Sequence, residues 1–500
     1  MTHVPSRSAF PAGLALAPHK RQALARPIVE VPPPDVLCVA LDQGSGTVAV
    51  PVVAPGDHVT LGTVIARDAS GFAATLHAPV SGRVRAIENL PVSTAQDTGP
   101  CVVIENDGRE TRNPQLQPGG PLESLEPDVL IAGLGAAGIA GLGGAAFPAA
   151  TKLAAARARQ ARVLVLNGAE CEPWICCDDA MMREHAADVV LGAQVLMRAL
   201  GAGHVSIAVE DDKSEAIAAL RAAIAAAGTT AIEVTVLPAV YPAGAERQLL
   251  TAVTGVEVPT LGLPADVGVT CQNVATAAAA ARWFRTGEPS IDRVVTVTGS
   301  AVAAPGNVRA RLGTTLRELV LAAGGYRGIP RRLIVGGSMT GRAVATDAIG
   351  LAKSTNCVLA ASPGDLQPRA AQHELACIRC GDCAAACPAG LLPQQLHRAA
   401  RVEDLAALER FGVEDCIECG CCDYVCPSQI PLTQQFRIAR SALRAHAAGV
   451  ARATAARERF ARHERRMLEA AESERREFAV ARRRARDPSG GISHDGPADD

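Results

Sequence analysis

Hydrophobic residues in the middle of the chain alternate between short apolar runs and longer helical patterns. Arg162–Asn167, Val205–Val209 and Ile232–Leu237 are short runs rich in Val, Leu and Ile, which is typical of buried strands. Met181–Leu200 repeats apolar residues with the spacing of a helix. Strands that alternate with helices predict a parallel, Rossmann-like sheet in an α/β domain, which we assign to residues 125–285.

Ahead of this region the pattern changes to short strands separated by Gly and Pro turns. Gly56–Gly62 and His77–Val84 are similar to the two halves of a lipoyl-type barrel-sandwich hybrid, which we place at residues 35–120. A carrier domain of that type needs a lysine at its hairpin tip, but no lysine occurs between Lys20 and Lys152. We therefore expect a docking or structural module.

The remaining segments differ from one another in composition. Residues 290–345 return to strands and resemble a small β-grasp module, for which we expect a structural role. Residues 365–440 are rich in cysteine, and residues 441–486 are rich in Ala, Arg and Glu. The latter predict a long polar helix, either solvated or docked on a membrane surface or partner. An N-terminal segment (1–34) and a disordered tail (487–500) complete the predicted organisation.

Charge and hydropathy argue against nucleic-acid binding, a membrane span and an export signal. The formal net charge of −2 lacks the basic character expected of a nucleic-acid-binding protein. The uncharged run Val129–Thr151 is rich in Gly and poor in Leu, Ile and Phe, so we do not expect it to span a membrane. The apolar stretch Phe10–Ala17 is short and broken by Pro11 and Gly13, so we do not expect an export signal.

Half of the 16 cysteines form two copies of one motif, in which three closely spaced cysteines are followed by a fourth and a proline. The copies are Cys377, Cys380, Cys383, Cys387-Pro388 and Cys416, Cys419, Cys422, Cys426-Pro427. Thiolates are the soft ligands that iron–sulfur clusters prefer, and in two-cluster ferredoxins the fourth cysteine of each run binds the other cluster. The motif therefore predicts an α-helical domain with two [4Fe-4S] clusters and crossed ligand sets. These sets are Cys377, Cys380, Cys383 and Cys426 for cluster 1, and Cys416, Cys419, Cys422 and Cys387 for cluster 2.

Zinc is the alternative metal that such cysteines could bind, although zinc sites usually leave a longer gap between cysteine pairs. Cys421 interrupts the spacing of the second run, so we expect it not to be a ligand. Cys171, Cys176 and Cys177 lack a fourth grouped partner, and we expect them to be inert, buried thiols.

Four further motifs indicate a nucleotide site. A glycine-rich segment, Gly141–Pro148, leads to Lys152, and glycine backbone can approach a phosphate or ring closely. Asn167–Pro173 and Tyr241–Glu246 each follow a predicted strand, and Cys271–Thr276 comes later. Open α/β sheets bind ligands at loops beyond the carboxyl ends of their strands.

In this order, the four motifs resemble those of the NADH-binding flavoprotein subunit of respiratory complex I. With the double cysteine motif behind them, residues 15–440 are similar to the RnfC family of Rnf ion-translocating oxidoreductase complexes. The resemblance implies that FMN and its phosphate are lined by Gly141, Gly143, Gly144 and Lys152. It also implies that the flavin is contacted by Asn167, Glu170, Asn273 and Thr276, and that Tyr241 belongs to the same site. By the same resemblance, Glu172 and Glu246 lie on the NADH side. Departures from the family pattern include Ala146, Ala149, Trp174, Cys177 and Ala180.

The resemblance also implies a function. It predicts a peripheral subunit on the cytoplasmic side of the inner membrane, which passes electrons between NADH and ferredoxin, or another iron–sulfur partner, through FMN and two [4Fe-4S] clusters. Ion translocation would belong to membrane-spanning subunits of the same complex. The cofactors supply the chemistry, so we expect no catalytic acid, base or nucleophile. Two alternatives stay open: an electron relay without NADH oxidation, and a cobalamin reductase of a bacterial microcompartment.

Overall fold

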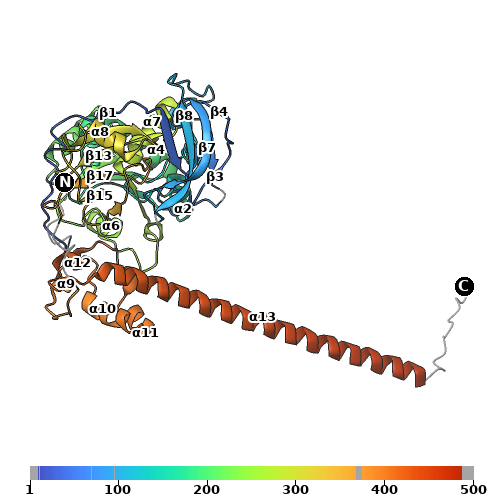
Figure 1. Ribbon diagram of the computed structural model, residues 1–500. Helices are drawn as coiled ribbons and strands as arrows, with labels where there is room; N and C mark the ends of the chain where they lie inside the picture. Colours follow the sequence, from blue (N-terminus) through green and yellow to red (C-terminus); the bar gives the residue numbers. More distant parts are fainter. Residues whose placement is uncertain (1–9, 11, 69, 95, 367–373, 487–500) are drawn as a thin grey trace, which may run out of the picture.

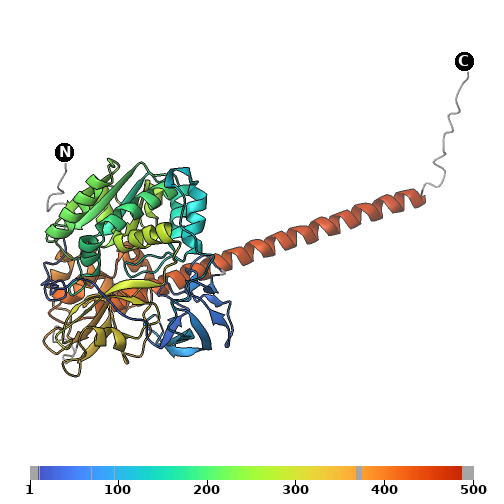
Figure 2. The ribbon, with the colours of Figure 1, turned by 90° about the horizontal axis from the view of Figure 1, so that it is seen from above.

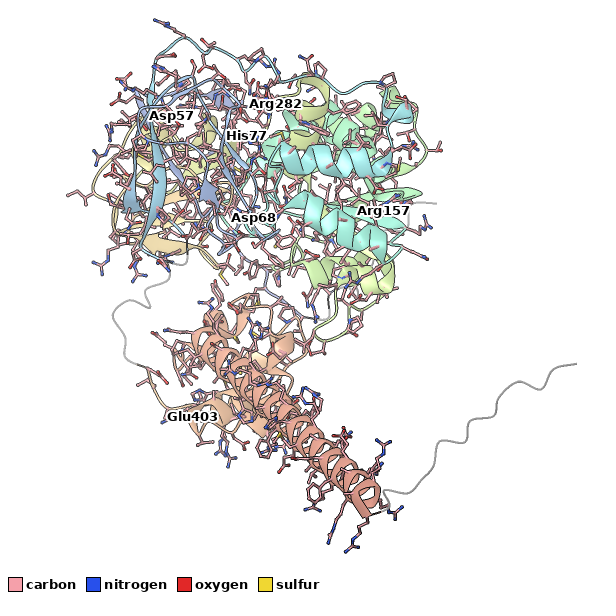
Figure 3. All side chains as sticks on the ribbon, turned by 90° about the vertical axis from the view of Figure 1, so that its right-hand side faces the viewer. Asp57, Asp68, His77, Arg157, Arg282 and Glu403 are labelled. Atoms are coloured by element: carbon pink, nitrogen blue, oxygen red, sulfur yellow. The ribbon has the colours of Figure 1, made fainter. Side chains whose placement is uncertain are left out.

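The computed structural model describes residues 10, 12–68, 70–94, 96–366 and 374–486 (Figure 1). The predicted tail at 487–500 and residues 1–9 of the predicted N-terminal segment lie outside the described residues. Figure 3 shows the barrel-sandwich and Rossmann-like regions next to each other, with the cysteine-rich region below them. Its labels mark the first region by Asp57 and His77, the second by Arg157 and the third by Glu403.

Two small sheets form the N-terminal barrel-sandwich. One sheet has the order β2-β8-β7-β4 and the other the order β3-β5-β6. Alternate residues such as Leu37, Val39, Val102 and Ile104 are buried between the sheets, as the two-residue period of a strand requires. The strands are β2 (Val36–Ala40), β3 (Val50–Pro51), β4 (His58–Val59), β5 (Val64–Arg67), β6 (Leu76–His77), β7 (Gly82–Pro91) and β8 (Thr98–Asn106).

A parallel sheet of order β11-β10-β9-β12 forms the centre of the next domain, which confirms the predicted α/β class. Its strands are β9 (Val163–Gly168), β10 (His204–Glu210), β11 (Ile232–Leu237) and β12 (Val269–Asn273). The helices are α1 (Pro127–Ala136), α2 (Ala149–Ala158), α3 (Cys177–Glu184), α4 (Ala186–Leu200), α5 (Ser214–Ala226), α6 (Glu246–Thr254) and α7 (Val274–Thr286), with short 3₁₀ turns at Leu122–Ser124 and Pro264–Val267. Because β9 lies between β10 and β12, the loops after β9 and β12 meet at one edge of the sheet.

The predicted helix Met181–Leu200 is wrong in one respect, because the structure divides it into α3 and α4. The backbone of His185 leaves the helical region between them, with φ of −126° and ψ of 34°. The break allows α3 to begin earlier, at Cys177, directly behind the loop that follows β9.

A six-stranded sheet of order β1-β14-β13-β17-β15-β16 follows. Its elements are β1 (Val29–Glu30), β13 (Asp292–Thr298), β14 (Gly306–Arg311), α8 (Leu316–Ala322), β15 (Arg332–Val335), β16 (Arg342–Val344) and β17 (Cys357–Ala361). A strand from the N-terminal segment, β1, forms one edge, and β17 lies beyond the predicted end of the module at residue 345. This sheet therefore draws on residues far apart in the sequence.

The cysteine-rich region is built from short helices around a small core of Leu396, Leu408, Val413 and Phe436. Its elements are α9 (Asp382–Ala385), α10 (Pro393–Arg401), α11 (Leu405–Arg410), a 3₁₀ turn at Val413–Asp415, α12 (Cys421–Val425) and α13 (Leu432–Arg486). The last helix begins inside this core and continues through residue 441 without a break, far beyond the rest of the molecule (Figures 1 and 2).

Most of α13 is surrounded by solvent. Among its residues only Leu432, Phe436 and Ala439 are buried, all in the first three turns. Further out, the pairs Arg462–Glu458 and Arg476–Glu472 have the i,i+4 spacing that weakly supports an exposed helix. No helix within the described ranges combines the length and the apolar character that crossing a bilayer requires.

Lys353 joins the barrel-sandwich to the two domains beside it. Its side chain is fully buried, and its Nζ donates to the carbonyl oxygens of Gly138, at 2.6 Å, and of Thr75, at 3.2 Å. Burial without a carboxylate partner lowers the pKa of Lys353 to about 7. The neighbouring His77 is also buried, and burial lowers its pKa to about 3. Two titratable groups are therefore held at this junction in environments that disfavour their charged forms.

Lys353→Met should weaken the pH dependence of stability between about pH 7 and 8.5. Because the folded pKa is depressed to about 7, the unfolded chain holds a proton there that the folded chain lacks. Stability should thus rise with pH in the wild type, by up to about 1.4 kcal/mol per pH unit, and this contribution should vanish in the variant. Melting temperatures across this window test the prediction, and parallel pH profiles for the two proteins would contradict it.

Candidate functional site

The loops after β9 and β12 form one wall of a cavity between the parallel sheet, the six-stranded sheet and the cysteine-rich region. Asn167 at the end of β9 is in register with Asn273 at the end of β12. The cavity volume is about 230 Å³, whereas one water needs roughly 10–15 Å³. Its lining includes Gly143, Asn167, Glu170, Cys171, Glu172, Asp178, Tyr241, Gly244, Asn273, Thr340, Asn356 and Cys419.

Six of the residues predicted to bind flavin or nucleotide line this cavity. They are Gly143, Asn167, Glu170, Glu172, Tyr241 and Asn273. Five others, Gly141, Gly144, Lys152, Glu246 and Thr276, do not belong to its lining. The structure thus brings the three loop motifs together with the middle of the glycine-rich segment.

The glycine-rich segment is a tight turn pressed against Asn273. A Cβ at Gly143 would lie 3.3 Å from Asn273 Nδ2, and Gly144 has a φ of +114°, which disfavours any other residue. Thr276 supports the turn from behind, because its Oγ1 accepts from Leu142 N–H at 2.9 Å and donates to the Ala140 carbonyl at 3.1 Å. Thr276 therefore positions the turn.

The side chains of the two asparagines at the strand ends form hydrogen bonds to other protein atoms. Asn167 donates to the Gly244 carbonyl at 2.9 Å and accepts from Ala169 N–H at 3.1 Å. Asn273 accepts from Ala275 N–H at 2.8 Å, as the N-cap of α7, and donates to Asp178 at 2.6 Å. These amides hold the shape of the cavity wall.

Glu170 anchors the start of α3. Its carboxylate accepts from the backbone N–H of Asp178 at 2.9 Å and of Asp179 at 3.2 Å. Burial, followed by the nearby Asp178 charge, raises the pKa of Glu170 to about 7, while Lys20 opposes that change. Its main role in this structure is to hold α3 against the loop.

Lys152 and Glu246 are ion-paired with each other at 2.8 Å, close to the cavity but outside its lining. Both side chains are partly exposed. Partly exposed ion pairs are weak, so an anion that approached the glycine-rich turn could replace Glu246 as the partner of the Lys152 ammonium.

Glu172 reaches the turn between β15 and β16. It accepts from the backbone N–H of Met339 at 2.9 Å and of Thr340 at 2.8 Å, and from Thr340 Oγ1 at 2.7 Å. The six-stranded sheet therefore contributes to this site, and the carboxylate of Glu172, a residue predicted to lie on the NADH side, is already hydrogen-bonded to this turn.

The N-terminal segment crosses the loop after β9, which the sequence did not predict. Trp174 N–H donates to the Pro18 carbonyl at 2.8 Å, and the Trp174 ring stacks on His19 with centroids 4.4 Å apart. Lys20 Nζ donates to the Glu170 carbonyl, and Leu14 pairs with Tyr241. The consecutive residues Pro18, His19 and Lys20 thus all contact this loop.

The eight motif cysteines line two small cavities in crossed groups. Cys377, Cys380, Cys383 and Cys426 lie around one, and Cys387, Cys416, Cys419 and Cys422 lie around the other, together with Cys421. In both cavities the fourth cysteine comes from the other run. These are the two groups that the crossed ligand sets require, and thiolates in fours suit an iron–sulfur cluster chemically.

The spacing of the sulfur atoms argues against a single zinc ion. Tetrahedral zinc with Zn–S bonds near 2.3 Å draws its sulfur ligands to about 3.8 Å from one another. Among the described residues, the one group of three or more potential ligand atoms within 4.8 Å of one another is Glu170, Cys177 and Asp178. The motif cysteines are therefore spread more widely than one zinc ion requires, and a larger cluster fits better.

Cys419 connects the two kinds of site, because it lines both the second cysteine cavity and the cavity at the sheet edge. Tyr241 lies between them and donates its hydroxyl to the Cys419 carbonyl at 2.6 Å. Asp415 fastens the cysteine-rich region to the sheet domain through Arg247, at 2.9 Å, and Thr260, at 2.8 Å. A ligand in the sheet-edge cavity would thus border the second cysteine group directly.

Four known domain families match successive parts of the chain. The RnfC barrel-sandwich hybrid domain matches residues 8–109, and the Nuo51 FMN-binding domain matches residues 134–282. The SLBB domain matches residues 294–343, and the 4Fe-4S dicluster domain matches residues 376–430. These matches confirm the predicted order of fold types.

Several whole proteins with similar sequences are named as the C subunit of the ion-translocating oxidoreductase complex. The chain is 44% identical to that protein of Pseudomonas aeruginosa over 92% of its length, and 39% identical to that of Rhodobacter capsulatus over 85%. It spans 59% of the Pseudomonas protein and 81% of the Rhodobacter protein. A chain of an NAD⁺-reducing [NiFe]-hydrogenase in the H2-reduced state aligns over 61% of this chain and 62% of its own, with 22% identity and a TM-score of 0.43.

Proposed function

Because the chain belongs to the family of C subunits of the ion-translocating oxidoreductase complex, we propose that it passes electrons between NADH and iron–sulfur clusters through FMN. The observation that carries this proposal is the position of Cys419, which borders the sheet-edge cavity and the second cysteine cavity at once. Two redox sites that share a wall can exchange electrons without a further carrier.

The residues at the sheet edge fit FMN. The turn at Gly143 and Gly144 leaves room for a ring or phosphate, and Lys152 can supply a positive charge once it exchanges Glu246 for an anion. Asn167, Asn273, Glu170 and Thr276 would hold the wall in place through their hydrogen bonds to the backbone and to Asp178. When bound, FMN supplies the conversion between a two-electron hydride donor and single-electron acceptors.

The thiolates of Cys416, Cys419, Cys422 and Cys387 would hold the cluster nearer the flavin, and those of Cys377, Cys380, Cys383 and Cys426 the more distant one. When bound, such clusters carry one electron at a time. Tyr241 would fix the separation between the flavin cavity and the nearer cysteine group, since it contacts both.

The location and partners also form part of the proposal. We place the protein on the cytoplasmic face of the inner membrane, as a peripheral subunit beside membrane-spanning partners that translocate the ion. The exposed outer part of α13 and the more distant cysteine cavity leave two surfaces for partner subunits or a ferredoxin-like acceptor.

Anaerobically purified, cofactor-loaded protein tests the proposed function. Addition of NADH should bleach the flavin and cluster absorbance, and a one-electron dye should then be reduced continuously. A protein that carries flavin and clusters but shows no bleaching with NADH would favour an electron relay without NADH oxidation.

Lys152→Met should weaken binding of FMN by about 10-fold or more and leave riboflavin binding unchanged, because only FMN carries the phosphate that the ammonium would bind. Titrations of flavin-free protein, followed by quenching of flavin fluorescence, measure both affinities. Arg157→Met removes another cation of α2, which is paired with Asp128, and should change neither. Equal loss of FMN and riboflavin affinity in Lys152→Met would contradict the assignment.

A further inference from the structure

Asp178 has a buried carboxylate oxygen that nothing in the described structure satisfies. The residue is 8% exposed and lines the sheet-edge cavity. Its Oδ2 accepts from Asn273 Nδ2 at 2.6 Å, while its Oδ1 has no hydrogen-bond partner. An unsatisfied buried acceptor of this kind costs about 1–3 kcal/mol, so a site that retains one is suited to a ligand that donates to it.

The charged groups around Asp178 are already engaged with other atoms. Lys20, from the N-terminal segment, donates to the Glu170 carbonyl, and Lys213, at the start of α5, pairs with Glu210. Arg293, from β13, donates to the carbonyls of Leu142 and Lys353. Burial raises the pKa of Asp178, although the hydrogen bond from Asn273 and the Arg293 charge oppose this. None of these cations forms a hydrogen bond to Oδ1 of Asp178, and the residue lines the cavity.

A metal ion is a poor occupant for this position. Glu170, Cys177 and Asp178 lie close enough together to share an ion. However, both oxygens of Glu170 accept backbone N–H groups of α3, and the Cys177 Sγ is 3.5 Å from the same carboxylate. Burial raises the pKa of Cys177 well above its usual range, which disfavours the thiolate that a metal would bind.

Asn356, from the six-stranded sheet, supplies the opposite kind of group to the same cavity. It precedes β17 in the six-stranded sheet, lines the cavity, and has its amide nitrogen 3.9 Å from the position of a Cβ on Gly144. Within the part of the chain that the structure describes, its side chain makes no hydrogen bond. The amides of Asn167 and Asn273 are committed to the protein, so Asp178 and Asn356 are free polar groups available to a ligand.

We propose that Asp178 accepts the hydrogen bond from the ring N–H of the bound flavin and that Asn356 donates to an adjacent ring carbonyl. The proposal rests on the proposed function. The polar edge of a flavin presents one N–H between two carbonyl oxygens, and an acceptor and a donor that line the same cavity match these two kinds of group. The six-stranded sheet would then take part in flavin recognition through Asn356, beyond the structural role expected from the sequence.

A flavin methylated at that ring nitrogen, 3-methyl-FMN, tests the assignment in flavin-free full-length protein. Wild type should bind 3-methyl-FMN at least about 10-fold more weakly than FMN, since a hydrogen bond to a charged group is lost. Asp178→Ala should bind the two flavins with similar affinity. Asn356→Ala should weaken both equally and keep the 10-fold preference, because its partner is a carbonyl. Fluorescence quenching gives all of these affinities.

Asp179→Asn is the matched control, because its carboxylate is also buried on α3 but pairs with Arg183. It should keep the wild-type preference. If Asp178→Ala does not fold, as judged by circular dichroism, Asp178→Asn replaces it and should reduce the preference at least threefold. A variant at Asp178 that discriminates as wild type does would overturn the proposal, as would wild type that binds both flavins equally. Wild type that binds neither flavin would instead overturn the proposed function.

Discussion

Cys419→Ser is expected to lose about half of the iron and to stop NADH from reducing the cluster that remains. Serine replaces one ligand of the cysteine group that borders the flavin cavity. The other group, around Cys377 and Cys380, keeps all four thiolates, but no residue of its cavity also lines the flavin cavity. NADH should still bleach the flavin, while the surviving cluster should be reduced only by dithionite. Iron analysis and paramagnetic resonance after each reductant measure these outcomes.

Two variants separate this effect from a general loss of structure. Cys380→Ser should also lose about half of the iron, yet NADH should still reduce its remaining cluster, because that cluster adjoins the flavin cavity. Cys171→Ser alters another cysteine of the cavity wall, which accepts a hydrogen bond from Gly244 N–H, and should retain both clusters. If Cys380→Ser blocks reduction by NADH and Cys419→Ser does not, the proposed order of the clusters is wrong.

Gly192→Ala is expected to destabilise the protein by about 3 kcal/mol or more, a large effect for one methyl group. Gly192 lies on α4 where that helix crosses α7, and a Cβ there would overlap the carbonyl oxygen of Ala277 and lie 2.8 Å from its Cα. The obstacle is helix backbone, so no side-chain rotation can relieve it. The two helices would have to separate, and α7 begins at Asn273 in the wall of the cavity. Thermal unfolding and flavin content should both report the loss.

Gly449→Ala provides the comparison for the same substitution in an open environment. Gly449 lies in the exposed part of α13, and a Cβ added there would have no atom within 4 Å. Alanine favours helix over glycine by about 0.8–1 kcal/mol, so this variant should be neutral or slightly stabilised. Equal melting temperatures for the two variants would show that the α4–α7 crossing tolerates a wider spacing than the structure indicates.

Local spacing predicted much of this structure because the relevant physics is local. Short Val- and Leu-rich runs such as Val163–Gly168 are typical of buried strands when helices alternate with them, and the predicted parallel sheet is confirmed. The cysteine runs specify their chemistry through spacing that spans a few residues, and the dicluster domain match confirms their class. Individual ligands of each cluster remain a prediction from that spacing.

Contacts between distant segments could not be predicted in this way. The partner of Glu172 is the backbone at Met339 and Thr340, more than 160 residues away, and backbone donors leave no sequence signature. The sequence gives no signal for Asp178, because its importance arises from an unsatisfied carboxylate oxygen, which depends on packing. Asn356 comes from a different domain. Each case depends on how two domains meet, which residue patterns do not encode.

Quantification of iron, acid-labile sulfide, zinc and flavin in anaerobically purified protein tests most directly whether the cavities hold two iron–sulfur clusters and FMN. We expect about eight iron atoms, about eight sulfides and about one FMN per chain, with little zinc. Brown protein with these ratios, and a paramagnetic signal after reduction, would agree with two thiolate-bound clusters beside a flavin. Colourless protein with about two zinc ions and no flavin would contradict it.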